Sequence, residues 1–369
     1  MEDKVHFYGW ERVKQSIIEI ANNNNIKIID YVDNYFLNLN TSVVVTDWYG
    51  IIHHTPSDFS GNNIQNLFKY TKFIESLNKC KALITLSEYN KLNIKNELDK
   101  IGLDIRIIVI KHPIPPIVDK KFNIELFEQN LKIYNIGGWL RNPYTIYKAK
   151  ILYNGISLNK IKLKGTYMNQ YFPPDDFNIS SIIHNIDNIK SNIVSYSSDF
   201  LNRLYNNYII MCRPNNYINY YLKYLFEYAI DLYYNKSSNY YNKKEQLINH
   251  LELNHNSVEI KEYINNDDYL NMLISSLVFC EYIDCSASNT IVECISTGTP
   301  IILNYHQAIE EYLGIDYPLY YHKVYDKNTD TYNLTSEKIL ETHNYLLDIK
   351  NKGDLELEYL KNILNNIIT

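Results

Sequence analysis

The expected fold is decided by the stretch Asp284-Cys-Ser-Ala-Ser-Asn-Thr-Ile-Val-Glu293-Cys-Ile-Ser-Thr-Gly-Thr-Pro300-Ile-Ile-Leu-Asn304. It is typical of the end of a buried strand, a loop of small residues, a helix with one glutamate, and the next strand. Ser288 or Asn289 is expected to cap the helix, so that the N–H groups of Ser288–Thr290 face outward beside the positive end of the helix dipole. Such a terminus binds anions, most often phosphate.

The same helix carries Glu293 about one turn further on, where a carboxylate is placed to accept hydrogen bonds from a sugar diol. Phosphate donors and a diol acceptor on one helix predict a nucleotide or nucleotide-sugar site. The alternative is an ordinary strand–helix unit with a capped helix and a surface glutamate.

This stretch resembles the donor-binding segment of GT-B glycosyltransferases, especially those of glycosyltransferase family 4. In that family a helix glutamate holds the nucleotide ribose, and a Gly-Thr-Pro turn leads into the next strand. The family usually carries two glutamates with seven residues between them. Here Glu293 matches the second, and Cys285 occupies the first position. Because the first glutamate is commonly tied to the donor sugar, the resemblance implies that this chain handles that sugar differently or has lost the chemistry.

Bulk composition narrows the functional classes. The 369 residues suffice for two domains, and 46% hydrophobic with 21% charged residues fits a soluble globular protein. A net charge of −6 provides no basic surface for a nucleic-acid backbone. No apolar run approaches roughly 18 residues and the amino terminus lacks a signal-peptide layout, so no membrane span and a cytoplasmic location are expected. The 36 tyrosines and 11 glycines indicate an AT-rich genome, such as that of a large DNA virus, which would place the protein in the host cytoplasm.

Cysteine usage points to a reducing compartment and away from metal. The five cysteines are odd in number, and several lie in apolar contexts, as expected of reduced interior residues. Cys280, Cys285 and Cys294 lie close in sequence, but their spacing fits no zinc pattern. We therefore expect no metal and no cofactor, with a nucleotide-diphosphate sugar as co-substrate.

Strand and helix patterns alternate along the chain, which predicts mostly parallel α/β sheets. In the first third, helical patterns at 10–22, 64–78 and 88–101 separate strands expected at 5–8, 26–30, 42–46, 81–87 and 106–111. Further strands are expected at 131–136, 161–165, 208–212, 257–261, 277–282 and 300–304, with an aromatic helix at 220–234 and closing helices at 336–350 and 354–367.

The proline-rich segment His112-Pro-Ile-Pro-Pro116 breaks this alternation, because proline stops helices and leaves central strands. The expected organisation is an amino-terminal acceptor-side domain (1–115), a linker (116–128), a donor-side domain (129–350) and a closing helix (351–369). Two Rossmann-like α/β domains facing across a cleft form the GT-B plan, here metal-independent. By analogy with that plan, the closing helices cross back to the first domain.

Paired histidines are the candidate catalytic residues. His53 and His54 follow the third expected strand, and histidine can act as a base or bind a sugar hydroxyl near neutral pH. If successive residues stay extended, the two side chains point to opposite faces, so only one would enter the cleft. The alternative is that both histidines pack or cap a turn.

The start of the second domain supplies candidate phosphate ligands. Gly137 and Gly138 allow close approach of a ligand to the backbone, and Arg141 offers a charged fork to a diphosphate. In the family an arginine after this strand is followed by a lysine, for which Lys148 is the nearest candidate. The donor-binding prediction therefore comprises Gly137, Gly138, Arg141, Lys148, Ser288, Asn289, Thr290 and Glu293.

Three functions remain open at this point. The first is a glycosyltransferase that moves a sugar from a nucleotide-diphosphate sugar to a glycan, protein or lipid-linked acceptor, by retention or inversion. The second is a nucleotide-sugar epimerase on the same fold. The third is a non-catalytic nucleotide-sugar binding protein, motivated by Cys285.

Overall fold

The computed structural model describes residues 10–39, 41–57, 63–115, 120–137, 140–141, 145–163, 258–261 and 264–368. The described residues up to Leu163 and from Glu259 belong to one compact unit. The expectations for 5–8, 208–212, 220–234 and Gly138 lie outside the described residues.

The amino-terminal half forms a four-stranded parallel sheet in the order β1-β2-β3-β4. Its strands are β1 (Lys27–Ile29), β2 (Trp48–Ile52), β3 (Cys80–Thr85) and β4 (Ile107–Val109). The helical elements among them are α1 (Trp10–Asn23), a π-helical turn η1 (Asn34–Asn38), α2 (Ile64–Leu67), α3 (Thr71–Leu77) and α4 (Glu88–Lys100).

The strand expected at 42–46 is wrong. That segment contains no strand, and the sheet instead uses Trp48–Ile52. Val45 is 74% exposed, whereas Trp48 and Ile52 are fully buried. A run of valines has high strand propensity, but burial against neighbouring elements decides which segment enters the sheet. The helical pattern at 64–78 likewise forms two short helices, α2 and α3, in place of one.

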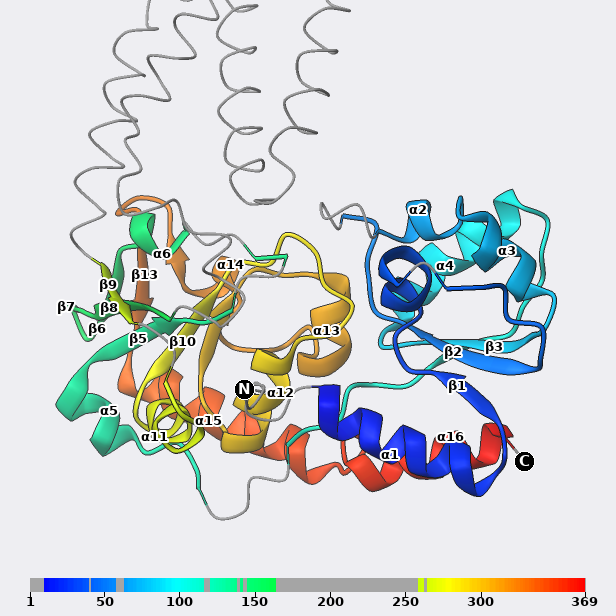
Figure 1. The fold of residues 1–369 in the computed structure, drawn as a ribbon. Coiled ribbons are helices and arrows are strands. Elements are labelled where there is room, and N and C mark those ends of the chain that lie inside the picture. The colour runs from blue at the N-terminus through cyan, green and yellow to red at the C-terminus, as the bar shows by residue number, and fades with distance from the viewer. Residues whose placement is uncertain are drawn as a thin grey trace, which may run out of the picture. The chain divides into compact units, whose positions relative to one another are not determined.

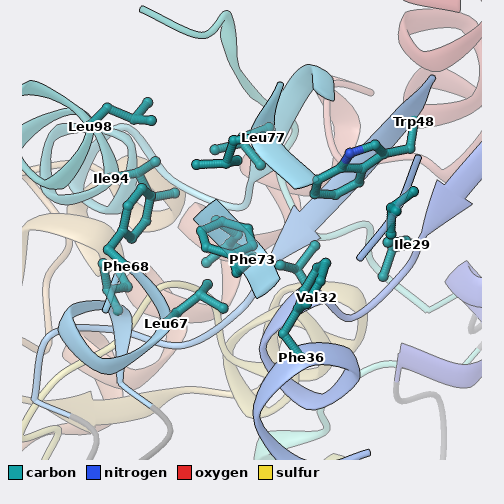
Figure 2. Packing of buried hydrophobic residues seen from close by; sticks show 14 residues of the cluster. Ile29, Val32, Phe36, Trp48, Leu67, Phe68, Phe73, Leu77, Ile94 and Leu98 are labelled. Atoms are coloured by element: carbon teal, nitrogen blue, oxygen red, sulfur yellow. The ribbon is translucent and has the colours of Figure 1, made fainter. Parts of the chain in front are cut away.

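Aromatic side chains fill the core on one side of this sheet. Phe36 lies edge-on to Phe73 with ring centroids 5.2 Å apart, and Phe73 lies edge-on to Phe68 at 5.1 Å. Figure 2 shows these rings packed between Trp48 and Val32 on one side and the α4 residues Ile94 and Leu98 on the other. Edge-to-face packing of this kind adds to the stabilisation from burial alone.

The carboxy-terminal half forms a five-stranded sheet in the order β11-β10-β5-β8-β9, in which β11, β10, β5 and β8 are parallel. Its strands are β5 (Lys132–Asn135), β8 (Asn159–Leu163), β9 (Val258–Lys261), β10 (Leu277–Cys280) and β11 (Ile301–Leu303). The helices are α5 (Ile124–Asn130), α6 (Thr145–Lys148), α11 (Asn266–Ser275), α12 (Asn289–Thr297), α13 (Gln307–Leu313), α14 (Tyr321–Val324) and α15 (Ser336–Asn351).

A small third sheet, which the sequence patterns did not predict, has the order β12-β13-β6-β7. It joins two strands that precede residue 164, β6 (Ile151–Tyr153) and β7 (Ile156–Ser157), with two strands near the end of the chain, β12 (Tyr325–Asp326) and β13 (Thr331–Leu334). Helix α5 begins at Ile124, inside the segment 116–128 that was expected to link two domains. The domain boundaries themselves stay a prediction.

The last helix, α16 (Leu357–Ile368), packs on the amino-terminal sheet. Leu360 and Leu364 share a buried cluster with Val13 and Ile17 of α1 and with Ile51 of β2. Figure 1 shows α1 and α16 lying side by side. Helix α16 therefore returns to the first part of the chain as expected, whereas α15, the other closing helix, packs on α12 and α5 of the carboxy-terminal half. Within the described ranges, no helix has the length and apolar character needed to cross a bilayer.

Candidate functional site

The order of strands in the second sheet fixes where a ligand is expected. Numbered along the chain, the five described strands read 3-2-1-4-5 across the sheet, with β5 first and β10 fourth. The order reverses between β5 and β10, which pair in parallel with Ile133 beside Leu277. Ligands of open α/β sheets bind beyond the carboxyl ends of the strands at such a point. The segments after β5 and β10 are the ones that carry the predicted donor-binding residues.

Arg141 connects these two segments. Its Nη1 donates to the carbonyl of Ile136 at 2.6 Å, and its Nη2 donates to Ser288 Oγ at 2.8 Å. Its guanidinium carbon also lies 5.0 Å from the ring centroid of Tyr282, in cation–π geometry. The side chain is only 8% exposed, so a permanent positive charge is held in a largely water-free place. Two predicted residues 147 positions apart are thus brought into direct contact.

Gly137 is required by this arrangement. Its φ of +73° lies in the left-handed region, and a Cβ atom there would collide with the Arg141 guanidinium. Glycine alone meets both demands at no steric cost. The group that closely approaches the Gly137 backbone is the chain's own Arg141, and approach of a ligand to this backbone stays a prediction.

The amino terminus of α12 lies against the same guanidinium. Ser288 occupies the cap position, but its hydroxyl makes no capping hydrogen bond, contrary to expectation. That hydroxyl accepts from Arg141 and lies 2.8 Å from the hydroxyl of Tyr282. The carbonyl of Ser288 accepts from the N–H groups of Ile291 and Val292. Asn289 and Thr290 form the first turn, where the helix dipole is positive and favours an anion.

A lysine that the sequence patterns did not single out lies next to this site. Lys162 of β8 is fully buried, and its Nζ donates to Asn135 Oδ1 and, at 3.4 Å, to the carbonyl of Gly137. Burial lowers the pKa of Lys162 to about 7, the thiol of Cys280 opposes that shift, and the charge of Arg141 adds to it. The sequence places two lysines in this strand, Lys160 and Lys162, and gives no signal that only Lys162 is fully buried.

Glu293 is an interior residue and not the surface glutamate of the alternative reading. It is fully buried, and its Oε2 accepts a hydrogen bond of 2.6 Å from the hydroxyl of Tyr269 on α11. Burial, followed by the charge of Glu293, raises the pKa of Tyr269 well above its usual range. A buried carboxylate one turn from an anion-favouring terminus is a strong acceptor of hydroxyl groups.

Both candidate histidines are buried at the end of β2 and contact the same tyrosine. The ring of Tyr31 lies 4.4 Å from that of His53 and 5.4 Å from that of His54, so the two side chains do not point to opposite faces. His53 Nε2 lies 2.9 Å from the carbonyl of Asp30, and His54 Nε2 lies 2.6 Å from the Tyr31 hydroxyl. Burial lowers the pKa of His53 to about 3, so this ring is neutral near pH 7.

Polar contacts connect His53 and the nearby Ser57 to the loop before α12. Ser286 Oγ donates to the carbonyl of His53 at 2.6 Å, and the N–H of Ser57 donates to Asp284 Oδ2 at 3.1 Å. Burial would raise the pKa of Asp284, but hydrogen bonds from His306 and Ser57 outweigh it and lower the pKa to about 2. Asp284 is therefore an ionised carboxylate at the position just before Cys285.

Cys285, which takes the place of the family's first glutamate, is 4% exposed. Burial raises the pKa of its thiol to about 12, so it carries no charge near neutral pH. Cys80, Cys280, Cys285 and Cys294 are all free thiols. In the part of the chain that the structure covers, no three His, Cys, Asp or Glu side chains are grouped as metal ligands would be.

For two of the predicted donor residues, the structure does not describe how they lie at the site. Gly138 lies outside the described residues, and Lys148 ends α6 without a described side chain. The structure thus brings Gly137, Arg141, Ser288, Asn289 and Thr290 together and places Glu293 further along α12.

Comparisons with known proteins give structural similarity only. No family model matches the chain, and no curated protein matches its sequence. Among solved structures it is similar to TarM, with 14% identity, a TM-score of 0.31, and coverage of 96% of this chain but 54% of TarM. It is also similar to the N-terminal domain of Candida albicans trehalose-6-phosphate phosphatase, with 9% identity and a TM-score of 0.42. The match covers 97% of this chain and 74% of that domain's chain.

A third similar structure is an alpha,alpha-trehalose-phosphate synthase (UDP-forming) from Burkholderia vietnamiensis, with 7% identity, a TM-score of 0.43, and coverage of 98% of this chain and 78% of that one. The chain thus spans about half the length of TarM. All three TM-scores are below 0.5, so the function has to follow from the residues of this chain.

Proposed function

We propose that this protein binds a nucleotide-diphosphate sugar between the ends of β5 and β10 and transfers the sugar to a hydroxyl-bearing acceptor, on a GT-B fold. One observation carries the proposal: Arg141 Nη2 meets Ser288 Oγ at 2.8 Å at the point where the strand order reverses. That contact joins a buried permanent cation to the amino terminus of a nine-residue helix. Both are suited to hold a diphosphate.

The proposed chemistry needs stabilisation of the leaving diphosphate. Negative charge develops on the diphosphate as the bond between its oxygen and the anomeric carbon of the sugar breaks. Arg141 and the N–H groups at the start of α12 are fixed before the reaction and lie in a place of low exposure, which is the arrangement that stabilises such charge best. Glu293 would accept from the ribose diol, and the acceptor would approach His53 or His54.

Binding is tested first by a thermal-shift screen against UDP, GDP, ADP, CMP and common nucleotide sugars. A ligand that binds only the folded state raises the melting temperature, so selective stabilisation by one diphosphate nucleotide identifies the base. No stabilisation by any of them near millimolar concentration would overturn the proposal. Release of free nucleoside diphosphate, with and without candidate acceptors, then tests transfer.

The ribose contact has a sharper test in a double comparison. In the wild type, the 2′-deoxy form of the preferred nucleotide should bind about tenfold more weakly, because one hydroxyl–carboxylate hydrogen bond is lost. In Glu293→Gln the amide oxygen still accepts a hydrogen bond but carries no charge, so the preference for the 2′-hydroxyl should become smaller. Glu310→Gln is the matched control, since Glu310 lies on α13 and accepts from the exposed Tyr305 hydroxyl. An unchanged preference in Glu293→Gln would remove Glu293 from the site.

A second candidate function is binding of a nucleotide sugar without transfer. It is favoured by Cys285, whose buried, uncharged thiol replaces a carboxylate at the position tied to the donor sugar in the resembling family. A protein with this function would be stabilised by the nucleotide sugar but would release no nucleoside diphosphate. Gain of turnover in Cys285→Glu would support a lost activity, whereas turnover in the wild type would exclude this candidate.

A further inference from the structure

Lys162 is a buried amine beside the anion site, and neither the strand patterns nor the proposed transfer assigns it a role. It sits on β8 in register with Asn135 of β5. Its Nζ donates to Asn135 Oδ1 and to the carbonyl of Gly137. The Arg141 guanidinium packs against the same glycine, at the position that a Cβ atom would occupy. The two cationic side chains therefore converge on the turn that leaves β5.

The hydrogen bonds of Lys162 can be made by a neutral amine. A neutral amine has two N–H groups and one lone pair, whereas an ammonium group has three N–H donors. Among the described residues, Asn135 Oδ1 and the Gly137 carbonyl accept from Nζ, and these two acceptors can be served by the two N–H groups of the neutral form. Protonation would add a third donor, for which an anion at the end of β5 supplies an acceptor.

The surroundings of Lys162 also favour the neutral form while no anion is bound. Burial removes the ammonium from water, the Cys280 thiol of β10 acts in the opposite direction, and the Arg141 charge repels a second cation. On the neighbouring strand β9, Glu259 and Lys261 pair with each other at 3.6 Å. An incoming anion would reverse the balance, since an opposite charge within a few ångströms stabilises the ammonium.

We propose that Lys162 is a second cation of the anion site and takes up one proton from solvent when a phosphate-bearing ligand binds there. The identity of that ligand as a nucleotide rests on the proposed function, whereas the anion and the proton do not. Affinity should therefore fall as the pH rises above 7, because protonating the amine then costs progressively more.

The test is calorimetric titration of the full chain at pH 8 in two buffers of different ionisation enthalpy, Tris and Hepes. The preferred nucleoside diphosphate is the first probe and inorganic pyrophosphate the second. From a pKa of about 7, proton uptake should approach about 0.9 proton per bound ligand. The measured binding enthalpy should differ between buffers by that number times the difference in their ionisation enthalpies.

Variants assign the proton to Lys162. Lys162→Met should abolish the buffer dependence and weaken binding. Asn135→Asp keeps the lysine but gives it a carboxylate partner, so Lys162 should already be protonated at pH 8 and the uptake should vanish. Lys160→Met is the matched control: Lys160 lies two residues away on the same strand, donates to the Ala149 carbonyl, and should leave the uptake unchanged. If Lys162→Met fails to fold, Asn135→Asp carries the test.

The outcomes separate this inference from the proposed function. Nucleotide binding without proton uptake, or with uptake that survives in Asn135→Asp, would overturn the role of Lys162 and leave the proposed function intact. Binding of pyrophosphate with Lys162-dependent uptake, but of no nucleotide, would uphold the inference and overturn the proposed function. Binding of neither probe would overturn both.

Discussion

At the scale of single residues, the candidate site depends on charges placed where water scarcely reaches. Arg141 is 8% exposed and Glu293 is fully buried, so each gains its interactions in a medium of low dielectric constant. Arg141 also uses its planar shape, because two of its nitrogens reach two different acceptors, the Ile136 carbonyl and Ser288 Oγ. Shape as well as charge is therefore expected to matter for binding.

Substitution of Arg141 tests this directly. Arg141→Lys keeps the charge but loses the fork that spans both acceptors, so it should weaken nucleotide binding nearly as much as Arg141→Ala. Loss of a charge-assisted contact to phosphate corresponds to about 10- to 150-fold in Kd. Titration calorimetry measures the effect, with the exposed Arg12→Lys as control. Wild-type affinity in Arg141→Lys would show that charge alone suffices.

His53 makes stability depend on pH. Its pKa is lowered by burial to about 3, against about 6.5 in the unfolded chain. Between these values the unfolded state binds one more proton, so this contribution to stability is complete above pH 6.5 and is lost as the pH falls. His53→Gln should therefore lose less stability than the wild type between pH 7.5 and about 4.5. Urea unfolding at both pH values measures this, with exposed His322→Gln as control. An equal loss of unfolding free energy between the two pH values in the wild type and in His53→Gln would contradict the assignment.

At the scale of elements, the most consequential packing joins the two ends of the chain. Helix α16 is amphipathic, and its Leu360 and Leu364 are 3% and 1% exposed. They meet Val13 and Ile17 of α1 and thereby cover the β2 residue Ile51. An amphipathic helix buries its apolar face wherever a complementary face exists, which here is the amino-terminal sheet.

Truncation within α16 should show how much this packing contributes. Leu364→Ala leaves a cavity in a filled cluster and should destabilise the protein by about 2–5 kcal/mol. Leu340→Ala on α15, where the side chain is 41% exposed, should change stability by less than about 0.5 kcal/mol. Urea unfolding provides both values. A small effect of Leu364→Ala would mean that α16 separates from α1 at little cost.

At the scale of the whole unit, polar contacts connect the amino-terminal and carboxy-terminal sheets. Glu311 of α13 accepts the N–H groups of Glu88 and Tyr89 at 2.7 and 2.8 Å, so one half caps helix α4 of the other. The Tyr312 hydroxyl accepts from the N–H of His112 and donates to the Leu86 carbonyl. The His112 N–H and the Leu86 carbonyl belong to buried residues and would otherwise be unmatched, whereas the Glu88 and Tyr89 N–H groups lie in the first turn of α4, where no intrahelical acceptor exists.

Removing the charge of Glu311 should loosen this connection. Glu311→Gln keeps an acceptor oxygen but loses the charge that favours the start of α4, so the α4 cap should weaken by about 0.5–2 kcal/mol. Hydrogen exchange at the amides of Glu88 and Tyr89 should quicken accordingly. Glu310→Gln, whose carboxylate instead meets the Tyr305 hydroxyl, is the control. Unchanged protection of the two amides would indicate that the contact does not hold α4.

Much of the fold could be predicted because local patterns agree with burial. The buried strands over 277–280 and 301–303 and the α12 helix between them follow from apolar runs, a small-residue loop and the Gly298 turn, whose φ is +67°. The strand expected at 42–46 failed although Val44 is buried: Val45 is 74% exposed, and tertiary burial of Trp48 outweighs the strand propensity of the valines.

Local sequence patterns were sufficient for the α/β class, for the helix that begins after the small-residue loop, and for singling out Arg141, Ser288 and Glu293 as candidates. Three facts came from the folded chain alone: Arg141 contacts Ser288, Glu293 is fully buried, and Lys162 donates to the carbonyl of the same turn. The physical reason is that propensity and capping act within a few residues. Contact, burial and the resulting pKa values depend on which strands the sheet places side by side.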